Sequence, residues 1–83
     1  MAHNNLAIAL AQKGRTAEAE VYSREAVRLE PDSVLFRNNL ESFLVQQGKT
    51  DEAVEQYNEV LRLDPKNPEA QKDLRRLAFG ISP

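Results

Sequence analysis

The sequence predicts an all-α fold built from antiparallel helical hairpins, and three observations lead to this prediction. The stretch from Gly14 to Pro31, GRTAEAEVYSREAVRLEP, returns at Gly48 to Pro65 as GKTDEAVEQYNEVLRLDP, at an offset of 34 residues. A glycine opens and a proline closes each copy, as expected for helices that are bounded by short turns. No stretch shows the alternation of apolar and polar residues that marks a strand. A fixed period of this length is typical of stacked helical repeats.

The bulk composition limits the classes of partner. The chain has 83 residues, a net charge of −2, one histidine and no cysteine. This length allows one small domain. The acidic balance gives no reason to expect a nucleic acid, because phosphate binding usually appears as a basic stripe. No apolar run approaches the roughly 18 residues of a membrane span. We therefore expect a partner that is neither a nucleic acid nor a membrane.

The predicted domain holds two repeats and a final helix. Residues 1–33 form the first repeat and residues 34–67 the second, and each contains a helix, a glycine turn, a second helix and a proline. A last helix over residues 68–79 is expected to cap the apolar face of the second repeat, and residues 80–83 form a tail. Because the turns are short, neighbouring helices must run antiparallel, and the repeats are expected to stack into a right-handed superhelix.

Turn and cap residues set the predicted helix ends. Gly14 and Gly48 end the first helix of each repeat, since glycine is free to adopt the positive φ of a C-cap. Thr16 and Thr50 are the expected N-caps of the second helices, and one residue of the pair 32–33 is expected to cap the first helix of the second repeat.

Apolar residues at helical spacing predict the core. Glu20 and Arg24, which lie four residues apart, are expected instead to pair on the outer surface of their helix. The predicted core residues are Leu6, Leu10, Ala19, Tyr22, Ser23, Ala26, Val27, Phe36, Leu40, Phe43, Leu44, Ala53, Val54, Tyr57, Val60, Leu61 and Leu63, followed by Leu74, Leu77 and Ala78 in the last helix.

The pattern resembles the tetratricopeptide repeat (TPR) family over nearly the whole chain. Between Asn4 and Ser33, thirteen of thirty residues are identical to the residue 34 positions later. Period, glycine, alanine and proline all fall in register, which makes the resemblance specific. The residues that carry it are Leu6, Ala7, Leu10, Gly14, Ala19, Ala26 and Pro31 in the first copy, and Leu40, Leu44, Gly48, Ala53, Tyr57 and Pro65 in the second.

The chain departs from the family pattern at several places. His3 and Arg37 stand where the family has tryptophan, and Ser23 stands where it has an aromatic residue. Glu41 takes the place of a small residue that the family packs against the second helix. We expect the Glu41 carboxylate to reach either solvent or Arg75.

The resemblance implies that the first helices of the repeats line a concave groove that holds an extended peptide. The repeated Asn-Asn before leucine fits this role, because an amide carries a donor and an acceptor on one planar group and can pair with both groups of a peptide unit. Asparagine at this place can also serve only to brace the helices, and both roles stay open. Gln12, Leu35 and Gln46 also line the implied groove. The predicted peptide-binding residues are Asn4, Asn5, Ile8, Asn38, Asn39, Ser42, Lys72 and Arg76.

Some members of the family clamp the carboxylate of a chaperone's C-terminal tail with cations and asparagines. The matching positions here are Asn4, Ile8, Asn39, Glu69 and Asp73, of which only Asn39 fits, and the last two carry the wrong charge. We therefore expect no chaperone tail to bind through such a clamp.

The predicted function is protein–protein interaction through the groove. The alternative is a structural segment of a longer repeat protein that associates through its exposed terminal helices, and a homo-oligomer is one form of this association. We expect no enzymatic activity, cofactor or metal, because His3 is the only histidine and the glutamates have no nucleophile or acid–base partner at a helpful spacing.

Overall fold

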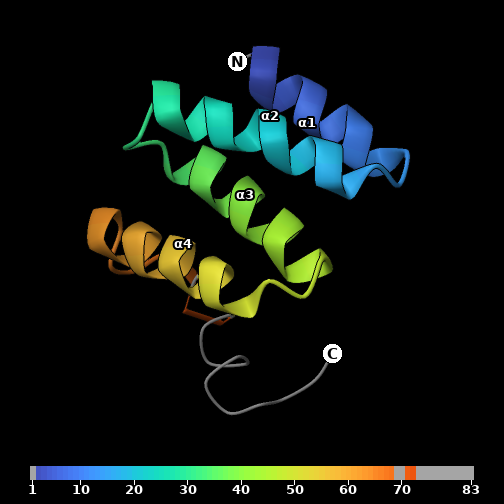
Figure 1. The fold of residues 1–83 in the computed structure, drawn as a ribbon. Helices are drawn as coiled ribbons and strands as arrows, with labels where there is room; N and C mark the ends of the chain where they lie inside the picture. Colours follow the sequence, from blue (N-terminus) through green and yellow to red (C-terminus); the bar gives the residue numbers. More distant parts are fainter. Residues whose placement is uncertain (1, 69–70, 73–83) are drawn as a thin grey trace.

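The computed structural model describes residues 2–68 and 71–72. This part of the chain is all-α, as predicted, and contains no strand. Two antiparallel hairpins, α1–α2 and α3–α4, lie side by side, with α2 packed against α3 (Figure 1). The helices are α1 (Ala2–Gln12), α2 (Thr16–Leu29), α3 (Val34–Gln46) and α4 (Thr50–Leu63). None of these helices is both long and apolar enough to cross a bilayer.

The predicted capping helix over residues 68–79 is described only at its start. Pro68, Gln71 and Lys72 are helical. The remainder of that helix and the tail over residues 80–83 lie outside the described residues, and so do the predicted core residues Leu74, Leu77 and Ala78.

The backbone conformation of the turn in the first hairpin recurs 34 residues later in the second hairpin. Gly14 and Gly48 have φ of +78° and +76°, so both glycines adopt the predicted left-handed C-cap conformation. The next amide in each turn, of Arg15 and of Lys49, donates to a carbonyl of the preceding helix at 2.9 Å in both cases. Equivalent residues of the two repeats therefore occupy equivalent places.

The prediction that threonines cap α2 and α4 was wrong. Thr16 and Thr50 are the first helical residues, and the N-cap residues are Arg15 and Lys49, whose side chains make no capping hydrogen bond. The glycine turn leads directly into the helix, so the Arg15 carbonyl already accepts the first helical bond from the Ala19 amide. By contrast, Ser33 caps α3 as predicted, since its Oγ accepts from the Phe36 amide at 3.2 Å.

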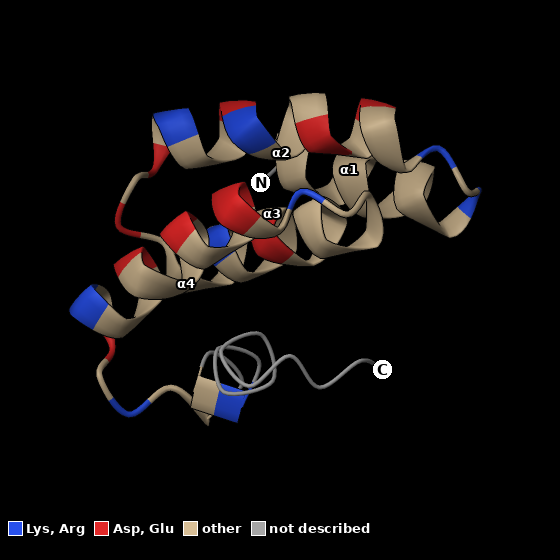
Figure 2. Ribbon diagram, turned by 60° about the horizontal axis from the view of Figure 1, so that its bottom comes forward, with Lys and Arg blue, Asp and Glu red and all other residues tan. Residues whose placement is uncertain are grey.

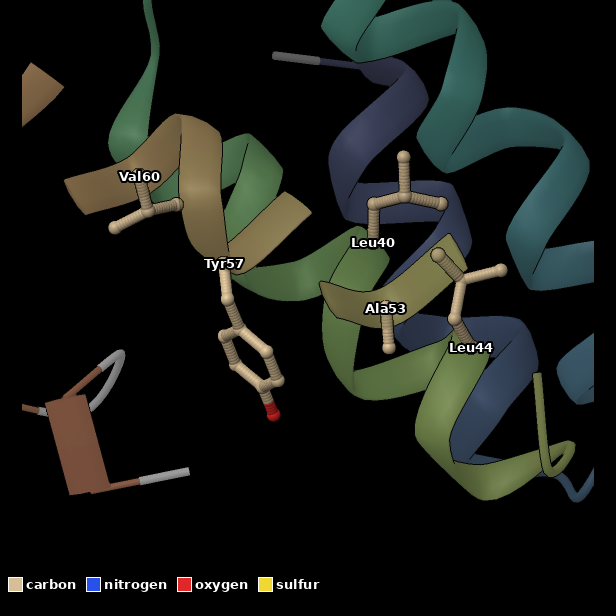
Figure 3. Close-up of a cluster of buried hydrophobic side chains, with 5 residues drawn as sticks. All are labelled: Leu40, Leu44, Ala53, Tyr57 and Val60. Carbon is tan, nitrogen blue, oxygen red and sulfur yellow. The ribbon is translucent and has the colours of Figure 1, made fainter. Parts of the chain in front are cut away.

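The core of the second repeat is a cluster of five buried side chains from α3 and α4 (Figure 3). Val27 of α2 packs against this cluster and so joins the two repeats. The five residues are Leu40, Leu44, Ala53, Tyr57 and Val60.

The core of the first repeat is smaller and depends on the second. Ala7 and Ala19 are buried against Phe43, which comes from α3, while Leu10 and Ala11 pack at the edge of the cluster. Two predicted core residues of this repeat are largely exposed: Leu6 at 43% and Tyr22 at 37%. That part of the prediction was wrong, because the spacing marks the apolar face of a helix but not whether a neighbour covers it.

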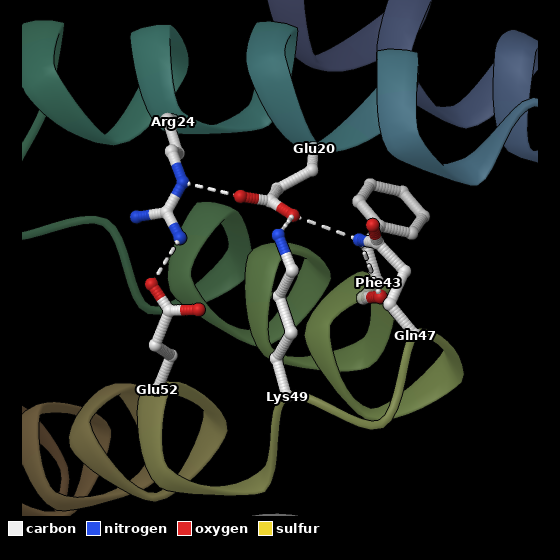
Figure 4. A network of polar contacts seen from close by, with 6 residues as sticks. All are labelled: Glu20, Arg24, Phe43, Gln47, Lys49 and Glu52. Carbon is white, nitrogen blue, oxygen red and sulfur yellow. Dashed lines mark hydrogen bonds and ion pairs between the residues drawn. The ribbon is translucent and has the colours of Figure 1, made fainter.

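A polar network joins the repeats around Glu20, where the sequence suggested an exposed ion pair (Figure 4). Glu20 is buried, with 8% of its surface exposed. Its carboxylate accepts from Arg24 Nε at 2.6 Å, from Gln47 Nε2 at 2.8 Å and from Lys49 Nζ at 2.9 Å. Arg24 in turn donates to Glu52 of α4 at 2.9 Å. The predicted pairing of Glu20 with Arg24 is therefore confirmed, and Arg24 is exposed as predicted. The predicted place of Glu20 on the outer surface was wrong, because this residue is buried at the junction of the hairpins.

The network controls the ionisation of Glu20. Burial by itself would raise the pKa of this carboxyl group. Hydrogen bonds from Lys49, Arg24 and Gln47 outweigh burial and lower the pKa from 4.5 to about 2. Glu20 is therefore charged at neutral pH, and α2 is tied to the turn between α3 and α4 by a buried anion.

Glu41 is also buried, at 5% exposure, in the place where the first repeat has Ala7. The expectation that its carboxylate reaches solvent was therefore wrong, and the other expected partner, Arg75, lies outside the described residues.

Candidate peptide-binding face

The exposed sides of α1 and α3 form a surface that we call the α1–α3 face. The two helices contact each other directly. The buried residues of each helix lie on its other side, so the residues named here are exposed or half-buried. The face consists of Asn5, Ile8 and Gln12 from α1, and of Leu35, Asn38, Asn39, Ser42, Val45 and Gln46 from α3.

A hydrogen bond between two of the predicted asparagines links the helices beside this face. Asn39 Nδ2 donates to Asn4 Oδ1 at 2.9 Å. Asn4 is only 2% exposed, whereas Asn39 is half-buried. Asn4 therefore lies beneath the surface, and its oxygen fixes the orientation of the Asn39 amide at the surface.

The α1–α3 face carries no charged side chain over the described residues of these two helices. Helix α1 contains no lysine, arginine, aspartate or glutamate. Helix α3 contains Arg37, which binds the Pro31 carbonyl and Gln56, and the buried Glu41. The charged residues gather on α2 and α4, as the blue and red segments of Figure 2 show.

Exposed aliphatic side chains lie among the amides of this face. Leu35 is 56% exposed, and Ile8 and Val45 are more than a third exposed. At the far end of α3, Gln46 Oε1 lies 3.3 Å from the Thr16 hydroxyl at the start of α2. The face therefore combines apolar contact area with amide donors and acceptors.

The predicted site residues differ in how far they are exposed. Asn5, Ile8 and Ser42 are exposed, and Asn38 is half-buried on α3. Lys72 is exposed on the helical segment after α4, and Arg76 lies outside the described residues.

A shallow depression of about 350 Å³ lies elsewhere in the described part of the molecule. Its walls come from Gly48, Lys49, Thr50, Asp51 and Glu52, at the start of α4. Because none of these residues belongs to the α1–α3 face, the depression adds nothing to the candidate site.

Two protein-family models match the chain. Residues 2–29 match a model described as tetratricopeptide repeat, and residues 43–74 match a model described as TPR repeat. The chain belongs to the tetratricopeptide repeat family. Tetratricopeptide repeats are, in general, protein–protein interaction modules without a catalytic role. No individual curated protein matches the chain.

The second match extends beyond α4, and the geometry there continues the tetratricopeptide pattern. Arg37 Nε donates to the Pro31 carbonyl at 2.6 Å, and Gln71 Nε2, 34 residues later, donates to the Pro65 carbonyl at 2.7 Å. The turn that follows the second proline thus repeats the turn that follows the first.

The sequence alone missed two features of this face. Val45 was absent from the predicted site, although it lies three residues after Ser42 and therefore on the same side of the helix. The bond between Asn4 and Asn39 was also missed, since periodicity shows that two residues are equivalent but not that they touch. The repeat period of 34 residues does not single out this pair, whose members lie 35 residues apart.

Proposed function

We propose that the α1–α3 face binds an extended, uncharged peptide segment of a partner protein, and that the segment presents aliphatic side chains. One observation carries this proposal: the face lacks charged residues on α1 and α3, while Ile8, Leu35 and Val45 expose aliphatic surface between amides. A charged peptide would lose hydration there without gaining a counter-charge from these helices.

Asn39 is the residue that we expect to form a hydrogen bond with the peptide backbone. One N–H of its side chain is engaged by Asn4, and this bond holds the amide plane in place. Among the described residues its Oδ1 has no hydrogen-bond partner, so this oxygen is available to a peptide N–H. A donor or acceptor that is already oriented loses less entropy on binding than a freely rotating one.

Asn4 then acts through Asn39 rather than on the peptide. Asn5, Asn38 and Ser42 supply further polar contacts, and Ile8 supplies apolar contact. Lys72, which follows α4, and Arg76 stay predicted contacts outside the α1–α3 face, where they would meet the partner beyond its uncharged segment.

The test is a selection from a library of displayed random peptides, followed by titration of the enriched peptides against three variants. We expect the enriched peptides to be uncharged and rich in aliphatic residues. Asn39→Ala and Leu35→Asp should each weaken their binding by roughly tenfold, as loss of one hydrogen bond or one apolar contact implies. Asn58→Ala, on the exposed side of α4, is the matched control and should bind as the wild type does.

Circular dichroism melts of each variant separate loss of binding from loss of fold. Enrichment of charged peptides, or binding that both variants of the face leave unchanged in a folded protein, would show that this face is not the site.

A further inference from the structure

Three residues spaced four apart along α3 contact the first hairpin on successive turns of the helix. Asn39 donates a hydrogen bond to α1, Phe43 packs against both α1 and α2, and Gln47, the C-cap residue of α3, donates to α2. Residues four apart lie above one another on one side of a helix. We call this row of three residues the α3 seam.

The two ends of the seam are polar and its middle is apolar. Asn39 Nδ2 donates to Asn4 Oδ1 at 2.9 Å, and Gln47 Nε2 donates to Glu20 Oε1 at 2.8 Å. The two donors lie eight residues apart, which is about 12 Å along a helix. The apolar contact of Phe43 between them has no preferred direction, so it keeps α3 close without fixing its rotation. Hydrogen bonds weaken steeply when their angle changes, so the two ends of the seam fix the rotation of α3 about its own axis.

Gln47 is held on both sides of its side-chain amide (Figure 4). Besides its bond to Glu20, Gln47 Nε2 donates to the Phe43 carbonyl of α3 at 3.1 Å. Glu20 in turn is held by Arg24 and Lys49. The last turn of α3 is therefore joined, through one amide, to a carboxylate whose own position is fixed.

We propose that Gln47 is a positioning residue for the α1–α3 face: by joining the end of α3 to Glu20, it fixes the rotation of this helix and thereby the orientation of the Asn39 amide. The inference rests on the proposed peptide binding, in which Asn39 bonds to the peptide backbone. Without the Gln47 amide, α3 can turn about the Phe43 contact, and Asn39 loses its alignment with Asn4. The affinity of the face for a peptide thus depends on a side chain that does not belong to the face.

Lys49 offers a matched comparison for Gln47. Its ammonium group donates to the same oxygen of Glu20, at 2.9 Å. Lys49 is the N-cap residue of α4, however, so its ion pair ties Glu20 to α4 and not to α3. Loss of the Lys49 side chain should lower stability and leave the α3 seam in place.

The first test needs no peptide. NMR spectroscopy measures how fast the Nδ2 protons of Asn39 exchange with water in the free protein. We expect this exchange to become severalfold faster in Gln47→Ala and in Gln47→Glu, which keeps the length of the side chain but removes both donated hydrogen bonds. Lys49→Ala should exchange as the wild type does. Circular dichroism melts identify the variants that are folded at the temperature of the measurement.

The second test is a double-mutant cycle with an uncharged peptide enriched from the displayed library. Gln47→Ala should weaken binding of this peptide by roughly two- to fivefold in the wild-type background, the range of couplings that act through an intermediate residue. In the Asn39→Ala background the same change should have almost no effect, because no amide remains to be positioned. Lys49→Ala should bind the peptide as the wild type does.

Three results would overturn the proposal: unchanged exchange of the Asn39 protons in both Gln47 variants, an equal loss of affinity from Gln47→Ala in both backgrounds, or an equal loss from Lys49→Ala. The proposed function fails in a different way. A peptide whose affinity Asn39→Ala leaves unchanged binds elsewhere, whereas faster exchange in the Gln47 variants alone would still show that Gln47 positions Asn39.

Discussion

At the scale of single residues, Ser23 and Tyr57 show how far one side chain can differ at equivalent places of the two repeats. Both side chains are buried, since Ser23 is 0% exposed and Tyr57 is 2% exposed. Tyr57 belongs to the five-residue cluster of the second repeat. The Ser23 hydroxyl, by contrast, has no hydrogen-bond partner among the described residues. A buried polar group in this state lowers stability, since it has lost water and gained nothing in exchange.

Ser23→Ala should therefore stabilise the protein. Removing the unpaired hydroxyl leaves the small volume of the site almost unchanged, and we expect the free energy of unfolding to rise by about 1 kcal/mol. Urea denaturation followed by circular dichroism measures this change. Ser42→Ala, at an exposed position of the α1–α3 face, is the control and should have little effect on stability. A decrease for Ser23→Ala would mean that the hydroxyl makes a stabilising contact.

At the scale of elements, the glycine turns connect the helices of each hairpin. Gly14 has a φ of +78° and Gly48 a φ of +76°, values that L-residues with a side chain rarely adopt. A Cβ built at either place would have no heavy atom within 4 Å. The requirement for glycine therefore comes from the backbone alone and not from a close neighbour.

Gly14→Ala and Gly48→Ala should thus cost similar amounts of stability, about 1 kcal/mol each. The strain is the same in both turns, and neither site has a clash that would raise the cost further. Chemical denaturation of the two variants measures it. Gly48→Asn is the matched control, and it should cost less than Gly48→Ala because asparagine tolerates the left-handed region better. An equal cost for alanine and asparagine would show that a steric contact, and not φ, requires the glycine.

At the scale of the whole molecule, the Glu20 network links the two hairpins through a buried negative charge. The pKa of Glu20 is lowered to about 2 in the folded protein. Its contribution to stability is therefore fully present above about pH 4.5, and it is lost as the pH falls toward 2. The shift corresponds to roughly 3 kcal/mol at most, since the side chains of Lys49 and Arg24 are themselves partly open to solvent.

Glu20→Gln should consequently lower stability at neutral pH and flatten its dependence on pH between about 4.5 and 2. The neutral amide cannot form the ion pairs with Arg24 and Lys49, and it has no proton to gain on acidification. Urea unfolding at a series of pH values measures both effects.

Glu25→Gln is the matched control for this experiment. The pKa of Glu25 is also lowered, by its bond to Arg28, but that pair lies in solvent. We expect the control to keep most of the acid sensitivity of the wild type. If Glu20→Gln and the wild type lost stability in parallel over this range, Glu20 would not be the group that titrates.

The sequence predicted the features that repeat and missed the features that depend on what lies next to a repeat. Period, glycines and apolar spacing are local properties, so the helices, the turns and the buried Leu40, Leu44 and Tyr57 were predictable. Glu20 was assigned to the surface because a charge four residues from an opposite charge usually lies there. Its partners on the next hairpin, Gln47 and Lys49, come from far along the chain, and no local pattern indicates them.

The candidate site was predictable to the same extent. The resemblance to the family indicated the sides of α1 and α3 that carry Asn5, Ile8, Asn38 and Ser42, and the peptide-binding role of these residues stays a prediction. The depth of each side chain was not predictable, because it depends on how closely the two helices approach. Asn4 illustrates this, since it is buried although its equivalent in the second repeat, Asn38, is only half-buried.

The placement of Phe43 has a consequence for the order of events during synthesis. The ribosome releases α1 and α2 before α3, yet the largest side chain in the core of the first hairpin belongs to α3. The first hairpin contributes only Ala7 and Ala19 and the partly buried Leu10 and Ala11 to this cluster, which is too little apolar surface to hold two helices together against the loss of chain entropy. The nascent first hairpin must therefore wait for Phe43 to emerge, and the amino-terminal half of this chain completes its core only when the next helix has been made.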